Sequence, residues 1–127
     1  MKRHALIIED SMLVAMTIRD HLESCGYDVA VASSKAQAIS SAQLRCPDLI
    51  TAEDNLEDGS GIDAIREICR DKSIPVIFIV TNSERVEREQ PGAVILHKPF
   101  TQSALAEAMM TAEMFQALLI ASANVAA

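Results

Sequence analysis

The segment IPVIFIV (74–80) decides how the rest of the chain is arranged. It contains no charged residue and is rich in β-branched side chains, which favour strands. A strand that is apolar on both faces belongs in the middle of a parallel sheet that helices cover on both sides. We therefore predict a central strand at 74–80 in an α/β protein.

Short apolar segments and longer helical patterns alternate along the chain on both sides of this strand. Further strands are predicted at 4–8, 27–32, 48–52 and 92–96. Helices are predicted at 11–25, 35–45, 62–71, 83–90 and from 100 to about 124. Alternation of strands and helices without hairpins produces a parallel sheet between two layers of helices. The whole chain, 1–127, is thus predicted to be a single domain: a three-layer αβα sandwich around a five-stranded parallel sheet.

The composition excludes several classes of function. The 127 residues carry a formal net charge of −7, and nucleic-acid binding would require a surplus of Lys and Arg. The first apolar segment is too short for a signal peptide or a membrane span. Cys25, Cys46 and Cys69 form no C-x-x-C pair, so we predict small buried side chains in a reducing compartment. We expect a cytoplasmic protein that binds neither nucleic acid nor membranes.

Polar side chains follow four of the predicted strands at the point where each strand ends. They are Glu9 and Asp10, Glu53 and Asp54, Thr81, and Lys98. The carboxyl ends of parallel strands meet at one edge of the sheet, where such proteins bind their ligands. Taken singly, each acid could simply cap a helix N-terminus. Together, converging carboxylates repel each other unless a cation lies between them, and their oxygens suit Mg²⁺. The ammonium of Lys98 and the hydroxyl of Thr81 suit an anionic group such as a phosphoryl.

Four segments then give the chain a family resemblance. They are LIIED (6–10), PDLITAEDNLEDGSGIDAI (47–65), IPVIFIVT (74–81) and HKPF (97–100). With these segments in this order, the chain resembles the CheY-like receiver domains of bacterial response regulators over about residues 3–115. The resemblance implies a flavodoxin-like sheet with strand order 2-1-3-4-5. It also implies that the chain is not an enzyme: a histidine kinase or phosphotransfer protein would supply a phosphoryl group, Mg²⁺ would assist, and a downstream protein partner would receive the signal.

The resemblance also assigns roles to individual residues. Glu9 and Asp10 match the family's acid pair, with Asp10 the better candidate for direct contact with Mg²⁺. Asn55 matches the position whose backbone carbonyl coordinates the metal. Lys98 matches the lysine that contacts the phosphoryl group, and the following bond to proline is expected to be cis. Glu53 stands at the phosphoacceptor position, where it could also contact the metal.

Glu53 is the main departure from the family pattern, which has aspartate there. The added methylene moves the carboxylate outward by about 1.5 Å, and in-line phosphoryl transfer depends on positioning of that order. We expect phosphorylation at Glu53 to be poor or absent. Its longer side chain could instead reach Lys98 or the metal permanently and imitate the activated state, with one negative charge in place of nearly two.

Two further departures concern the family's switch residues. The family has a hydroxyl side chain at the end of this strand, but here that position is Val80 and Thr81 lies one residue later. The family often has an aromatic residue three residues before the lysine, but here that position is Ile95. Activation through a threonine and an aromatic rotamer is therefore not expected here.

Two alternatives to the leading hypothesis remain open. Asp54 could be the acceptor of a phosphotransfer intermediate or phosphate sink, although side-chain alternation should turn it away from Asp10. The chain could also be a degenerate receiver that serves as a dimerisation module. A haloacid-dehalogenase-type phosphatase, which also uses acids at strand ends, is disfavoured because the chain lacks that nucleophile motif and most of the required length.

The C-terminal segment 105–127 is unusually apolar for a last helix. One helical stripe could cover the sheet: Leu105, Met109, Ala112, Phe115 and Leu119. Other apolar residues extend beyond that stripe: Met110, Met114, Leu118 and Ile120. Either the helix belongs to the core and frays at its end, or it packs on a partner or forms a homodimer, since Met-rich surfaces suit such contacts.

Overall fold

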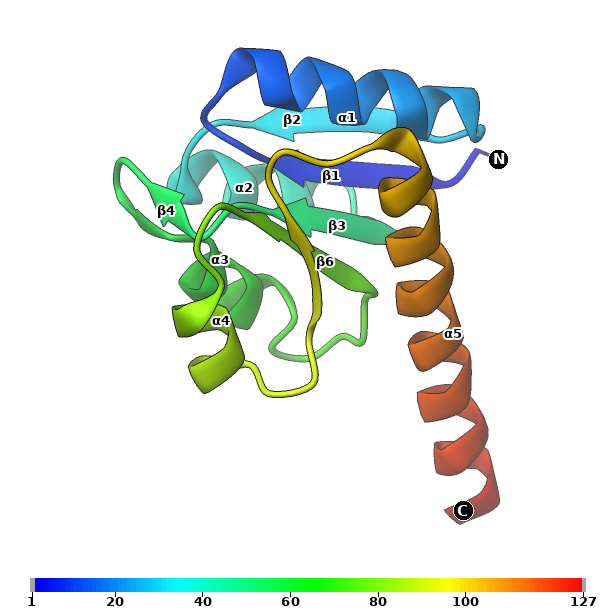
Figure 1. Ribbon diagram of the computed structural model, residues 1–127. Coiled ribbons are helices and arrows are strands. Elements are labelled where there is room, and N and C mark those ends of the chain that lie inside the picture. The colour runs from blue at the N-terminus through cyan, green and yellow to red at the C-terminus, as the bar shows by residue number, and fades with distance from the viewer. Residues whose placement is uncertain (1, 127) are drawn as a thin grey trace.

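A parallel five-stranded sheet forms the centre of the computed structural model, which describes residues 2–126 (Figure 1). Its strands are β1 (His4–Ile8), β2 (Asp28–Ala32), β3 (Leu49–Ala52), β6 (Val76–Val80) and β7 (Val94–His97). Their order in the sheet is β2-β1-β3-β6-β7, and every pairing is parallel. In chain order this is the predicted arrangement 2-1-3-4-5, so the fold class is confirmed.

Helices lie on both faces of the sheet. They are α1 (Met12–Ser24), α2 (Lys35–Leu44), α3 (Gly61–Ile68), α4 (Glu84–Glu89) and α5 (Gln102–Ala126). The first three are capped by serines: the hydroxyl oxygens of Ser11, Ser34 and Ser60 accept hydrogen bonds from backbone N–H groups in the first turn. Such caps satisfy donors that have no partner within the helix. The six-residue α4 has no side-chain cap, and its one buried residue is Val86.

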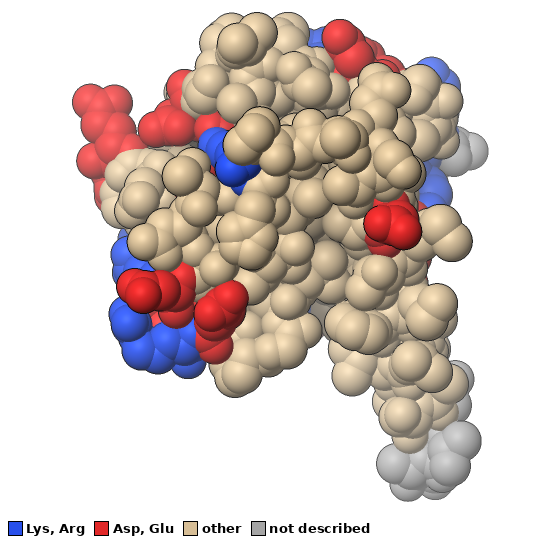
Figure 2. All heavy atoms as spheres, viewed as in Figure 1, with Lys and Arg blue, Asp and Glu red and all other residues tan. Residues whose placement is uncertain are grey.

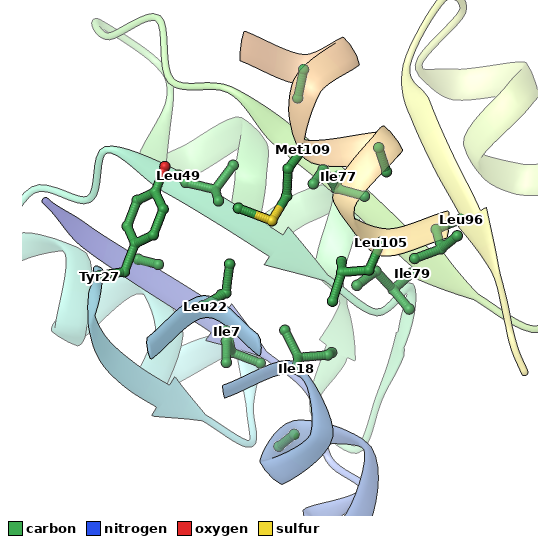
Figure 3. Packing of buried hydrophobic residues seen from close by; sticks show 14 residues of the cluster. Ile7, Ile18, Leu22, Tyr27, Leu49, Ile77, Ile79, Leu96, Leu105 and Met109 are labelled. Carbon is green, nitrogen blue, oxygen red and sulfur yellow. The ribbon is translucent and has the colours of Figure 1, made fainter. Parts of the chain in front are cut away.

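The core consists of two apolar clusters, one on each face of the sheet. On one face α1 and α5 cover the sheet, and Ile77 and Ile79 point toward Leu105 of α5 (Figure 3). On the other face Phe78 and Val80 pack with residues of α2, α3 and α4. The side chains of β6 are therefore buried on both sides of the sheet, as predicted for the central apolar segment.

A short hairpin between β3 and α3 was not expected from the sequence. It pairs β4 (Asn55–Leu56) with β5 (Gly59–Ser60) in antiparallel fashion. Both carboxylate oxygens of Asp58 in its turn accept hydrogen bonds from the first backbone N–H groups of α2. At Gly61, an added Cβ would lie 1.8 Å from the carbonyl oxygen of Glu53. Glycine is thus required there for α3 to begin directly against the end of β3.

The prediction of buried cysteines was wrong for two of the three. Cys25 and Cys46 are exposed, and Cys69 is partly buried. Cys25 lies at the C-terminal cap of α1 and Cys46 in the loop after α2, so neither faces the sheet. An adjacent apolar pattern does not bury a residue that lies beyond the last turn of its helix.

Helix α5 is buried along its first half only. Leu105, Met109 and Ala112 belong to the core, whereas Phe115 and Leu119, expected in the same stripe, are exposed. The helix projects beyond the body of the domain on the side away from the β4–β5 hairpin (Figure 1). Within the described residues, Gln102–Ala123 are long and apolar enough to cross a membrane by length and composition. This is weak evidence for a membrane segment, because the first half of the helix packs in the core.

Candidate functional site

Three charged side chains meet at the carboxyl ends of the strands. Glu9 follows β1, Glu53 follows β3 and Lys98 follows β7. The Lys98 ammonium lies 2.8 Å from Glu9 Oε1 and donates a hydrogen bond to Glu53 Oε2. Backbone hydrogen bonds extend the sheet to these positions, with Glu53 N–H donating to Ile8 and Lys98 N–H to Val80. The peptide bond between Lys98 and Pro99 is cis, as expected.

Backbone amides hold the remaining oxygen of each carboxylate. Glu9 Oε2 accepts a hydrogen bond from Ser11 N–H at 3.1 Å. Glu53 Oε1 accepts from the N–H groups of Asp54 at 3.0 Å and Asn55 at 3.4 Å. Each carboxylate therefore uses one oxygen for the backbone and the other for Lys98, which fixes both side chains in place.

Burial gives this cluster its electrostatic character. Glu9 and Glu53 are only 2% and 8% exposed. Burial raises the pKa of Glu9, although contacts with Lys98 and Ser11 oppose the rise. Burial by itself would lower the pKa of Lys98, but its contacts with Glu53 and Glu9 outweigh this effect and raise that pKa above its usual value. Lys98 therefore stays charged at neutral pH and supplies the cation that the two acids require.

The ion pair between Lys98 and Glu9 is not a well-directed hydrogen bond. Glu9 Oε1 is buried and accepts no hydrogen bond of good geometry, although the ammonium nitrogen lies within contact distance. We therefore attribute the contact between Lys98 and Glu9 to charge attraction. The directed hydrogen bond of Lys98 is the one that it donates to Glu53.

The other predicted site residues do not join this cluster. The side chains of Asp10, Asn55 and Thr81 are exposed. Within the described part of the chain, no three His, Cys, Asp or Glu residues are placed to hold a metal ion together. The Lys98 ammonium bridges the two buried carboxylates, so a cation such as Mg²⁺ would have to displace it to bind between them.

Asp54 makes a separate set of contacts. Its Oδ1 accepts a hydrogen bond from Ser60 Oγ at 2.8 Å and lies 3.8 Å from Arg85 Nη1 on α4. Arg85 in turn pairs with Glu89, which also binds Arg66 of α3. Neither Ser60 nor Arg85 was predicted from the sequence to have this role. The serine could have been found as the residue before a helix, but nothing in the charged segment 83–90 marks Arg85.

Comparison with known proteins places this chain in a family. A family model for the response regulator receiver domain matches residues 5–110, which include all three charged residues. The phyllosphere-induced regulator PhyR of Methylorubrum extorquens is 36% identical over 122 residues, or 91% of this chain and 45% of PhyR. The chain spans about half the length of several curated relatives that it matches.

Solved structures agree with this match. The solution structure of the PhyR receiver domain from Erythrobacter litoralis is 33% identical, with a TM-score of 0.83, and the match covers 91% of this chain and 92% of that one. The crystal structure of PhyR from Bartonella quintana, described as an anti-anti-sigma factor, is 32% identical with a TM-score of 0.82. That match covers 97% of this chain and 52% of the Bartonella chain.

Proposed function

Since this chain belongs to the response regulator receiver domain family, we propose that it signals by protein contact while its phosphoacceptor position is held by Glu53. Receiver domains are generally signalling modules without catalytic activity of their own. The observation that carries the proposal is the bridge formed by the Lys98 ammonium between Glu9 and Glu53. The family resemblance implies that Glu53 and Lys98 stand where a receiver handles its phosphoryl group.

Both oxygens of Glu53 are already engaged. Oε1 accepts two backbone hydrogen bonds, and Oε2 accepts one from Lys98. In-line transfer requires an unhindered oxygen in the correct position, and the longer glutamate side chain moves that oxygen outward. Phosphorylation at Glu53 is therefore reduced or absent. The contact with Lys98 instead imitates the activated state permanently, with one negative charge in place of the larger charge of a phosphoryl group.

Receiver domains of the CheY type generally bind Mg²⁺ at the phosphorylation site. In this chain we propose that Mg²⁺ competes with the ammonium of Lys98, because both cations need the same buried carboxylates. The residues that would hold the metal are Glu9, Asp10, Glu53 and the backbone carbonyl of Asn55. Mg²⁺ would supply the neutralisation of charge that Lys98 provides in its place.

The contacts of Asp54 argue against its use as a phosphate sink. Its carboxylate is buried and its Oδ1 is engaged by Ser60 and Arg85, so a phosphoryl group would have to fit beside the serine that caps α3. A degenerate receiver that only dimerises is the remaining alternative, and it predicts no effect of Glu53 on partner binding.

The proposed partners are proteins. A histidine kinase or phosphotransfer protein is the upstream partner implied by the family, and the output is a contact with a downstream protein in the cytoplasm. The description of Bartonella PhyR as an anti-anti-sigma factor belongs to a protein of which this chain covers 52%. We therefore propose a partner that binds the receiver domain itself.

Phosphorylation assays test the proposal directly. The wild-type chain and its Glu53→Asp and Asp54→Asn variants are incubated with Mg²⁺ and acetyl phosphate, and intact masses are measured. We expect no phosphoryl group on the wild type or on Asp54→Asn, and a gain of one on Glu53→Asp. An acyl phosphate on the wild-type chain would refute the proposal, and mapping it to Asp54 would establish the phosphate sink.

A further inference from the structure

The second half of α5 is apolar and uncovered. The sequence 114–127 contains no charged residue. Five large side chains there are each 45–60% exposed: Met114, Phe115, Leu118, Leu119 and Ile120. They point in several directions around the helix, and a helix that is apolar all round is normally buried. Figure 2 shows this projecting part in tan, without acidic or basic atoms, while charged side chains gather over α4.

A groove lies beside this part of the helix. Its volume is about 340 Å³, and it runs between α5, the loop before β6 and the loop before β7. Its apolar walls include Ile74, Pro75, Val76, Val94, Phe115 and Leu119. Among the described residues that line it, Lys72 is the one that carries a charge. Because Phe115 and Leu119 also belong to the exposed helix end, the groove and the helix end adjoin each other.

The apolar span Gln102–Ala123 cannot cross a membrane while the domain stays folded. Gln116 Nε2 donates a hydrogen bond to the carbonyl of Ser73 at 2.7 Å, and this contact joins the helix to the body of the domain. Insertion of the whole helix would remove Leu105 and Met109 from the core. The cover is therefore another protein surface.

We propose that this surface is covered by a second copy of the chain. The helix end and the groove are adjacent on the same molecule. A twofold axis can therefore place the α5 end of each copy in the groove of the other, which covers both apolar surfaces at once. The five side chains alone offer roughly 500 Å² per copy, before the groove walls, against about 800 Å² per partner in a stable interface. Two molecules that each carry a net charge of −7 repel each other. A dimer interface must therefore avoid bringing acidic residues together, and this surface has none beyond Glu113.

This dimer goes beyond the proposed function and does not depend on the state of Glu53. It is tested by analytical ultracentrifugation over about a hundredfold range of protein concentration. The wild-type chain is compared with Leu118→Glu, which charges the interface. The matched control is Leu44→Glu, because Leu44 is 89% exposed at the end of α2, outside the interface. Thermal melting shows that each variant is folded.

We expect the wild type and Leu44→Glu to sediment at twice the 13.8 kDa monomer mass. Leu118→Glu should be monomeric, with association weakened more than tenfold. Hydrogen exchange of the wild type should show protection of residues 72–76 and 90–94 that grows with concentration. A monomeric wild type at every concentration would overturn the proposal, as would equal dimerisation of the two variants. Sedimentation of a monomeric wild type with phosphatidylglycerol vesicles would assign the surface to a membrane instead.

Discussion

The substitution Lys98→Met tests whether one ammonium group stabilises the acid pair at the strand ends. Methionine keeps most of the apolar stem of lysine but removes the charge. Glu9 and Glu53 would then face each other without a cation, and both are almost fully buried. Because neither carboxylate can turn to water without leaving its backbone hydrogen bonds, we expect a large loss of stability at neutral pH.

The size of the loss follows from the burial of the three side chains. Breaking a buried ion pair by removing one partner costs about 3–5 kcal/mol. The Lys98 side chain is 18% exposed, so solvent screens part of the interaction, and about 2–4 kcal/mol remains for the variant. In a domain of this size, that corresponds to a fall in Tm of roughly 10 °C.

The pH dependence separates this effect from a simple loss of packing. The pKa of Glu9 is raised in the folded protein, so protonation of this carboxyl favours the folded state. The charged carboxylate destabilises the fold, and this effect disappears as the pH falls through that pKa. Loss of Lys98 raises this pKa further, because the lysine contact lowers it. The difference in free energy of unfolding between wild type and variant should therefore shrink as the pH is lowered from 7 toward 5. Mg²⁺ should also stabilise the variant more than the wild type.

Urea unfolding at a series of pH values, with and without Mg²⁺, measures these quantities. Lys2→Met is the matched control, because the Lys2 ammonium is exposed and lies 3.9 Å from its partner Asp28, and such surface pairs contribute little. A Lys98→Met variant as stable as the wild type at pH 7 would refute the reasoning. A loss of stability that stays constant with pH would show that the lysine acts through packing and not through charge.

Three further predictions concern the scaffold. Tyr27, the one tyrosine, should titrate with a pKa of about 12, raised by burial and by the hydrogen bond that it donates to Glu113. Phenolate absorbance should show a lower pKa for Tyr27 in Glu113→Gln. In the wild type, the stabilising contribution of Tyr27 should fall as the pH rises from 10 to 12. Gly61→Ala should lose several kcal/mol of stability, since the methyl group would collide with the carbonyl of Glu53. A urea unfolding curve close to that of the wild type would contradict the proposed contact. Val86→Ala should cost about 2 kcal/mol and, because this side chain anchors α4, should accelerate amide exchange in α4 more than in α3.

Most of the fold could be predicted because the relevant signals are local. The apolar segment 74–80 predicted a strand inside the sheet, and β6 lies between β3 and β7 with both of its faces covered. Alternation of strands and helices then gave the parallel sheet and placed the ends of its strands at one edge. The hairpin between β3 and α3 was not predicted because its strands are two residues each, which is too short for a periodic pattern.

The sequence by itself determined that acids and a lysine gather at one edge of a parallel sheet, because the direction of a strand follows from the connections that the chain makes. Only the tertiary structure decided that Glu9, rather than Asp10, shares the Lys98 ammonium with Glu53, and that Asp54 binds Ser60. Alternation along a strand fixes the direction of a side chain only while the strand continues, and these residues follow its last pair. The choice among them is made by the space and charge that distant segments bring to the same point.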